Sequence, residues 1–159
     1  WKLFESYEKR KQMALQGNIN NLTTFEWKDW YNIGIPNMDL QHKELFQKIL
    51  FLIKSTNGDK PAENLKAIDD VITYTKFHFS SEEELLKEHS YPEYNKHQEL
   101  HKDLLNQIYI LKNSISNDGN LSGMDLIGFF RAWIIDHIFQ HDTQYSHFLK
   151  GGNQYFAIR

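Results

Sequence analysis

A chain of 159 residues with a formal net charge of -3 is long enough for one compact domain and offers no excess of positive charge for nucleic-acid phosphates, so we expect no nucleic-acid partner. It contains no cysteine, which excludes disulfides, iron–sulfur clusters and thiolate metal sites and leaves nitrogen and oxygen as ligands for any metal. Apolar stretches such as Ile49 to Ile53 are far shorter than the ~20 residues that span a bilayer, so we expect a cytoplasmic protein without a membrane span.

Two segments precede the main helical part of the chain. Residues 1–16 place apolar side chains such as Phe4 and Tyr7 among basic ones, an amphipathic pattern that indicates an extra helix before Gly17. From Asn21 to Pro36 the chain is rich in aromatic residues and closes with glycine and proline. This composition indicates an extended arm that packs on the rest of the protein and seals its core.

Four longer segments then carry apolar residues at helical spacing. Asn37 or Asp39 suits the cap of the first helix, and Ser122 with Asp125 resembles a capping box for the fourth. The expected helices run from the first cap to about Ser55, from Pro61 to just before Ser90, from about Pro92 to Ser114, and from Ser122 to Gly151. We therefore expect an all-α protein: an antiparallel up-down-up-down four-helix bundle over residues 21–150, preceded by a helix or linker over 1–20 and followed by a tail over 151–159.

Two of the expected helices carry pairs of metal-ligand residue types at the same spacing. His78 and Glu82 are four residues apart in the second helix, and His97 and His101 repeat this interval in the third. Side chains four residues apart lie on one face of a helix, with Cβ atoms about 5–6 Å from each other. Each pair could therefore reach one metal ion or two adjacent ones.

The fourth helix carries a third pair with a wider interval. His137 and Asp142 are five residues apart, which an ideal α-helix at about 100° per residue would spread over well more than 90°. We predict a wide π-type turn between them, since such turns bring the fifth residue back to the same face and tend to occur at functional sites. With His42 near the start of the first helix, each helix then supplies at least one inward ligand.

Each of these features has an ordinary structural explanation when taken singly. A lone histidine is more often a hydrogen-bonded core residue than a ligand, and a pair at this spacing is often a surface pair. Burying five histidines and two carboxylates together would cost several kcal/mol per charged group unless a cation compensated them. The set suits two metal ions bridged by the carboxylates, and ligand type alone leaves iron, zinc, nickel and copper open.

The candidate ligands fall in four strings that follow one another at characteristic intervals. The strings are IGIPNMDLQHKELF (Ile33 to Phe46), HFSSEEELL (His78 to Leu86), HQELH (His97 to His101) and WIIDHIFQHDTQY (Trp133 to Tyr145). Together they resemble the signature of the hemerythrin family over roughly Asn21 to Leu149. Myohemerythrin, a member of this family, is an established example of an up-down-up-down bundle, so the resemblance implies the same fold as the periodicity.

The resemblance also implies a cofactor and a role for each ligand. The cofactor would be two non-haem iron ions, cycling between Fe2+ and Fe3+, with an oxo or hydroxo group as a third bridge. His97, His101 and His137 would hold one iron, and His42 and His78 the other. Glu82 and Asp142 would bridge the two. Dioxygen would bind at the iron held by His42 and His78, beneath an apolar wall for which Ile134 is the candidate by position, with Phe46 and Trp133 nearby.

The resemblance implies reversible dioxygen binding for storage, transport or sensing. Apart from the seven candidate ligands, no carboxylate or tyrosine stands out as a proton donor, which favours a binding protein over an enzyme. Two alternatives stay open: an enzyme in which the diiron centre reduces peroxide or nitric oxide or oxidises ferrous iron, and a sensor of iron or redox state. Residues 1–20 resemble none of the family's motifs. They could connect a bacterial signalling module, since hemerythrin domains are often fused to one, or favour self-association through an exposed apolar stripe.

Other polar residues near the ligands receive simpler interpretations. We expect His89, His141 and His147 to be surface residues or neighbours of the site, with His141 at its edge. Glu83 and Glu84 are expected on a solvated helix face. Tyr74 and Tyr145 could donate hydrogen bonds near the ligands or serve only in the core.

Overall fold

The computed structural model describes residues 25–56, 60–118 and 123–151, and every regular element among them is helical. After a short 3-10 helix, η1 (Asp29–Tyr31), come three long helices: α2 (Pro36–Ser55), α3 (Pro61–Glu88) and α4 (Tyr94–Asp118). The last rod is built from α5 (Gly123–Phe130), η2 (Arg131–Ile135), η3 (Ile138–Asp142) and α6 (Thr143–Leu149). The predicted all-α class is confirmed.

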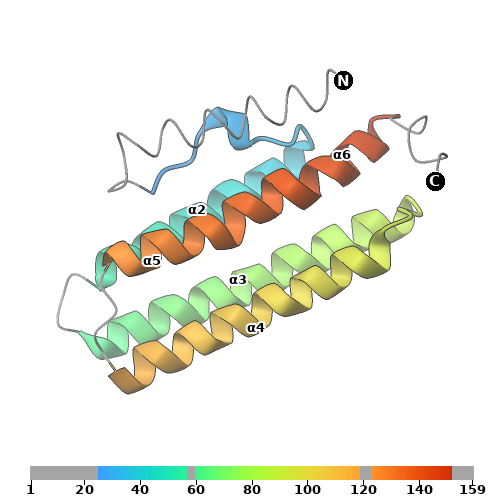
Figure 1. Cartoon of the computed structure of the whole chain (residues 1–159). Coiled ribbons are helices and arrows are strands. Elements are labelled where there is room, and N and C mark those ends of the chain that lie inside the picture. The colour runs from blue at the N-terminus through green and yellow to red at the C-terminus, as the bar shows by residue number, and fades with distance from the viewer. Residues whose placement is uncertain (1–24, 57–59, 119–122, 152–159) are drawn as a thin grey trace.

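The four rods form a bundle of two layers. In Figure 1, α2 lies beside the rod that ends in α6, and α3 lies beside α4, with successive rods pointing in opposite directions. This is the four-helix bundle that the sequence predicts. The expected helix over residues 1–16 and the tail beyond residue 151 lie outside the described residues. No described helix combines the length and the apolar character that crossing a membrane requires.

The first long helix begins differently from the prediction. Pro36 occupies its first turn, and the residue before it makes no side-chain cap. Asp39 lies inside the first turn instead, where its carboxylate accepts hydrogen bonds from the backbone N–H of Ile33 at 2.6 Å and of Gly34 at 3.0 Å. Gly34 has a positive φ of 79°, and a Cβ there would meet the ammonium group of Lys150. These contacts tie the arm to the start of α2.

The second helix agrees with its predicted bounds, and the third is longer than predicted. Helix α4 continues to Asp118 rather than ending at Ser114. The hydroxyl groups of Ser114 and Ser116 donate to the carbonyl oxygens of Ile110 and Lys112 within the helix, so these serines are accommodated without ending it. Buried Ile115 also extends the apolar stripe by one turn. The expected loop from Asn117 is therefore partly helical.

The fourth rod contains the predicted wide turn and a second one. The π-helix η3 spans Ile138–Asp142, which confirms the prediction made from the five-residue interval. Another π-helix, η2, spans Arg131–Ile135 and has no counterpart in the prediction. The predicted cap, Ser122, lies outside the described residues.

The core changes character along the bundle. At the end where α2 finishes and α5 begins, it is built of fully buried aliphatic side chains, among them Ile49, Leu52, Ile68, Val71, Ile108 and Leu126. On the outside of α2 the arm adds an aromatic layer, in which Phe25 stacks on Phe46 at 4.6 Å and Tyr31 lies 5.6 Å from it. The described part of the arm, from Phe25, is largely extended as predicted, apart from η1. Toward α6, the buried side chains include histidines and carboxylates.

Candidate metal centre

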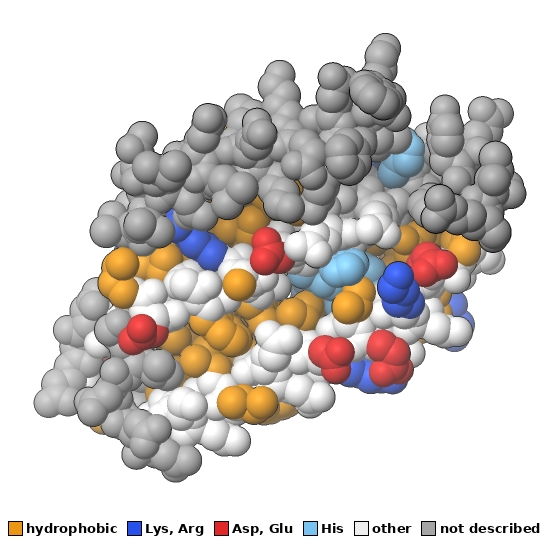
Figure 2. Space-filling model, in the orientation of Figure 1, with side chains coloured by type: hydrophobic (Ala, Val, Ile, Leu, Met, Phe, Trp, Pro, Cys, Tyr) orange, Lys and Arg blue, Asp and Glu red, His pale blue; other side chains and the backbone are white. Residues whose placement is uncertain are grey.

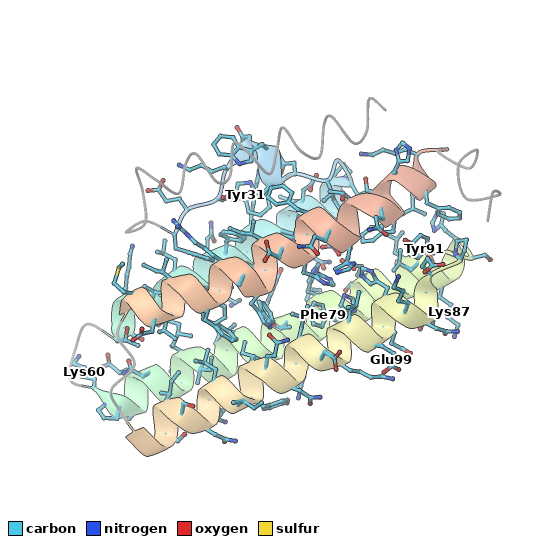
Figure 3. The ribbon with its side chains drawn as sticks, in the orientation of Figure 1. Tyr31, Lys60, Phe79, Lys87, Tyr91 and Glu99 are labelled. Atoms are coloured by element: carbon cyan, nitrogen blue, oxygen red, sulfur yellow. The ribbon has the colours of Figure 1, made fainter. Side chains whose placement is uncertain are left out.

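The seven side chains predicted to bind metal meet in the interior of the bundle. Each is at most 7% exposed, and they come from all four rods. Figure 3 shows side chains from both layers filling the space between them around Phe79. The set comprises His42, His78, Glu82, His97, His101, His137 and Asp142.

Within this set the ligand atoms form two overlapping groups. One group is Glu82, His97, His101 and His137, and the other is His42, His78 and Glu82; in each, the atoms lie within 4.8 Å of one another. We call these the three-histidine group and the two-histidine group. Because Glu82 belongs to both, the groups are adjacent and share a carboxylate.

The carboxylate of Glu82 directs one oxygen to each group. Its Oε1 lies 2.5 Å from His97 Nε2 and 3.3 Å from His101 Nε2. Its Oε2 lies 3.5 Å from His78 Nε2. A carboxylate divided in this way can bind two cations at once, one through each oxygen.

Asp142 repeats the arrangement from the opposite layer. Its Oδ1 lies 3.1 Å from His137 Nε2 and 3.5 Å from His97 Nε2, both in the three-histidine group. Its Oδ2 lies 3.4 Å from His42 Nε2, in the two-histidine group. The π-helix η3 makes this possible, because it returns Asp142 to the face of the rod that carries His137. Two carboxylates therefore bridge the two histidine groups.

Several atoms that face the centre have no hydrogen-bond partner although they are buried. These atoms are both carboxylate oxygens of Asp142 and the Nε2 atoms of His42 and His137. Leaving such groups unpaired is costly, and a cation would satisfy nitrogen lone pairs and carboxylate oxygens together. The residues present thus fit a pair of metal ions bound by nitrogen and oxygen.

The protonation states also suit metal binding. Burial raises the pKa of Glu82, but hydrogen bonds from His101 and His97 outweigh it and hold the pKa well below the usual value, so the carboxylate is ionised. Burial and the neighbouring His42 lower the pKa of His78 to about 3, which keeps its imidazole neutral. Metal ligands must be deprotonated, and these two residues already are at neutral pH.

His101 behaves differently in the metal-free protein. Burial opposes protonation of its ring, but the carboxylates of Glu82 and Glu83 outweigh burial and raise its pKa to about 9. A proton is thus retained between two carboxylates, where a cation would compete for the same negative charge.

Three further contacts surround the ligands. His101 Nδ1 lies 2.9 Å from Glu83 Oε1, and His78 Nδ1 lies 2.9 Å from Gln41 Oε1. The phenol of Tyr145, fully buried, donates to Glu82 Oε2 at 3.0 Å. Of the two roles expected for Tyr145, the structure shows hydrogen bonding near the candidate ligands.

The interpretation of Glu83 as a solvated residue is wrong. Its side chain is 21% exposed and reaches His101 on α4, whereas Glu84 is exposed as expected. Nothing in the EEE run distinguishes the two, because only the position of α4 beside α3 decides which glutamate faces a neighbouring helix. Tyr74 does not reach the site, and its hydroxyl donates to Glu44 at 3.1 Å.

The three residues predicted to line an oxygen pocket, Ile134, Phe46 and Trp133, are all buried. Phe46 belongs to the aromatic layer and lies 5.1 Å from Trp27, whose ring is 6.3 Å from that of His42. It is therefore on the side of the two-histidine group.

Trp133 lies on the other side of the centre. Its ring is 6.3 Å from Phe79, which stacks on His101 at 3.7 Å, and its Nε1–H donates to the carbonyl oxygen of Leu104. Its contacts do not favour it as a wall over the two-histidine group. Instead it lines a groove of about 310 Å³ between α4 and the fourth rod, together with His137 and His141. On this face, Figure 2 shows histidine among apolar side chains.

The remaining histidines belong to neither the three-histidine group nor the two-histidine group. His89 is exposed and His147 is half-buried. The ring of His141 lies 5.4 Å from that of His137, at the edge of the site as expected, and burial followed by the charge of His137 lowers its pKa to about 4.

Comparisons with known proteins agree with this geometry. Residues 33–149 match the hemerythrin HHE cation binding domain. The chain is 28% identical to a bacteriohemerythrin of Stenotrophomonas maltophilia over 131 residues, 82% of this chain and 85% of the relative. It is 27% identical to the myohemerythrin of Theromyzon tessulatum over 123 residues, 77% of this chain and 91% of the relative.

Solved structures give the same result. A crystal structure of wild-type hemerythrin superposes with a TM-score of 0.63 at 26% identity, covering 70% of this chain and 85% of the other. The match to the family extends over all seven candidate ligands, from the helix that carries His42 to the one that carries Asp142. The chain belongs to the hemerythrin family of cation-binding helical domains.

Proposed function

We propose that this protein binds dioxygen reversibly at a pair of non-haem iron ions. His97, His101 and His137 hold one iron, His42 and His78 hold the other, and Glu82 and Asp142 bridge them. The observation that carries the proposal is that both buried carboxylates direct one oxygen to each histidine group. The proposed cofactor includes an oxo or hydroxo bridge, with iron in the Fe2+ and Fe3+ states.

The two histidine groups differ in the number of ligands they offer. The three-histidine group supplies one more imidazole than the two-histidine group, so the latter has more room for an exogenous ligand. When bound, the iron pair supplies the electrons that dioxygen takes up on binding and receives them back on release. The residues of the chain hold the ions, orient the ligands and exclude water.

Water is excluded on the two-histidine side by aromatic and aliphatic side chains. Trp27 of the arm lies 6.3 Å from His42 and meets Phe46 edge-on, and Phe25 stacks on Phe46. Buried Ile134 is the proposed wall over the open position, by its place one turn before His137. A dry pocket of this kind slows the entry of protons and water that would convert bound oxygen to other products.

The surroundings of the bridge favour binding over turnover. Tyr145 is a buried hydroxyl in direct contact with a candidate ligand, and it already donates its hydrogen to Glu82. Burial and the charges of Glu82 and Asp142 raise its pKa well above the usual value, so it retains its proton. It is therefore a poor proton donor for catalysis. Membership of the hemerythrin family supports a binding protein rather than an enzyme in the same way.

Absorbance spectroscopy of the iron-loaded protein tests the proposal. Spectra are recorded under argon, then air, then argon again. We expect a charge-transfer band that appears with oxygen and fades when oxygen is removed. Irreversible conversion to a diferric form would instead support a diiron redox enzyme, such as one acting on peroxide, nitric oxide or ferrous iron, or a redox sensor.

Iron analysis tests the ligands separately. His101→Ala should lower the iron content from two ions per chain toward one, because it removes an imidazole from the three-histidine group. His89→Ala is the matched control, since His89 is an exposed histidine that belongs to neither group. An unchanged iron content in His101→Ala would contradict the ligand assignment.

Residues 1–20 carry a separate part of the proposal. We propose that they connect the domain to a signalling module or mediate self-association, on the basis of their amphipathic sequence. Sedimentation analysis of the chain with and without these residues measures the second possibility. A monomer in both cases would contradict self-association.

A further inference from the structure

Two candidate ligands make outer hydrogen bonds to side chains of different charge. In the three-histidine group, His101 Nδ1 pairs with the carboxylate of Glu83. In the two-histidine group, His78 Nδ1 pairs with the amide oxygen of Gln41. Both distances are 2.9 Å, so the contacts differ in chemistry rather than in length.

The carboxylate of Glu83 is held in place from the neighbouring helix. Its Oε2 accepts a hydrogen bond from Gln98 Nε2 at 2.9 Å, and the same amide lies 3.2 Å from the hydroxyl of Tyr94. Glu83 is thus fixed by side chains of α4 while its other oxygen meets His101. An anion held in place beside a candidate ligand orients the imidazole and raises its basicity more effectively than a mobile anion.

Both contacts place a hydrogen on Nδ1 of the imidazole. A carboxylate oxygen and an amide oxygen can only accept, so Nδ1 of His101 and of His78 carries the hydrogen. Nε2 of each ring then faces the carboxylate of Glu82, at 3.3 Å for His101 and 3.5 Å for His78, and is the nitrogen that a metal would bind, at His101 in exchange for its proton. The rings are therefore oriented for metal before any metal arrives.

The two contacts differ in how strongly they increase the ability of Nε2 to donate an electron pair to a metal ion. An anionic acceptor draws the Nδ1 hydrogen more than a neutral one, which increases electron density at Nε2. The phenol of Tyr145 adds to the difference, because it donates to Oε2 of Glu82, the oxygen that faces His78. That hydrogen bond takes electron density from the two-histidine side.

We propose that Glu83 is a positioning residue that makes the three-histidine position the tighter of the two, so that it takes up the first cation and the two-histidine position the second. The unequal charge of Glu83 and Gln41, together with the hydrogen bond from Tyr145, sets this order. The inference rests on the ligand assignment of the proposed function, and it goes beyond it by assigning an order of loading.

Titration of the metal-free protein with Co2+ under argon tests the order, with calorimetry for affinity and absorbance for coordination. The wild type should bind two ions in separate steps. Glu83→Gln should weaken the first, tighter step about 10- to 100-fold and leave the second within about twofold. Glu84→Gln, an exposed neighbour of the same charge, should titrate as the wild type. The inference is overturned if Glu83→Gln leaves the first step unchanged, or weakens the second step as much.

A reciprocal variant extends the test. Gln41→Glu places a carboxylate on His78 and should strengthen the second step, narrowing the gap between the two. If its metal-free form melts well below the wild type, Glu83→Leu, which removes the acceptor altogether, replaces it and should weaken the first step further than Glu83→Gln. An equal effect of Glu83→Leu on both steps overturns the inference.

The same measurements separate this inference from the proposed function. A wild-type titration in two steps with the expected Glu83 effect, combined with no reversible oxygen band, would contradict oxygen binding and support the order of loading. A reversible oxygen band with an unchanged first step in Glu83→Gln would do the opposite.

Discussion

The two halves of the bundle are equally buried and chemically opposite. The half that contains the end of α2 and the start of α5 is closed by aliphatic side chains such as Ile49, Ile68 and Leu126, all fully buried. The half toward α6 buries His42, Glu82 and other ionisable groups to the same degree. Burial of aliphatic groups stabilises the fold directly, whereas buried ionisable groups stabilise it only when they are compensated. The aliphatic half therefore stabilises the fold by itself, whereas the polar half depends on compensation of its buried charges.

Removal of metal should give the largest change in stability, because it acts on the half of the bundle that buries ionisable groups. At a free Fe2+ concentration of 1,000 times Kd, each site adds about 4 kcal/mol to the free energy of unfolding. Chelation under argon should therefore lower the melting temperature sharply while the helical circular dichroism of the folded state persists, because the aliphatic half remains intact. Equal melting temperatures with and without iron would show that the polar half is stable by itself.

Truncation in the aliphatic half should come next. Ile68→Ala removes a fully buried side chain from α3 and should cost about 2–5 kcal/mol of unfolding free energy in urea denaturation, with the iron content unchanged. Leu40→Ala, at a site that is 64% exposed, serves as the control and should cost far less. A loss of iron in Ile68→Ala would mean that the two halves are not separable.

A smaller loss of stability is expected on removing a hydrogen bond that the polar half makes without metal. Tyr145→Phe removes the hydrogen bond to Glu82 and should cost about 1.5–3 kcal/mol in the metal-free protein, since the acceptor is a buried carboxylate. Tyr74→Phe is a matched control, because its hydroxyl donates to Glu44 at a more exposed place. Equal costs for the two variants, measured by urea denaturation, would remove the distinction between buried and exposed donors.

The smallest effect is expected on the surface. Lys48 Nζ lies 3.0 Å from Asp70 Oδ2, and the carboxylate is 59% exposed. A double-mutant cycle of Lys48→Ala and Asp70→Ala should give a coupling energy of about 0–1 kcal/mol that falls with added salt. A coupling as large as the Tyr145 effect would mean that exposure is a poor guide to the strength of polar contacts in this bundle.

The parts of the molecule that can be predicted from sequence depend on local periodicity. The end of α2 and the bounds of α3 follow from the glycine and proline residues that flank these helices. The shared faces of His78 with Glu82 and of His97 with His101 follow from helical spacing. Even the π-helix η3 is predictable, because a five-residue interval between inward ligands is incompatible with an ideal α-helix. Spacing therefore indicates which side chains turn inward.

The parts that need the tertiary structure depend on which helices are neighbours. Glu83 and Glu84 have the same charge and adjacent positions, yet only Glu83 meets α4 and binds His101. The sequence favours Asp39 as a cap, but its carboxylate binds the backbone of Ile33 and Gly34, because the arm folds back over the start of α2. Helical spacing determines the face on which a residue lies, but the partner of that face is set by packing between segments far apart in the chain.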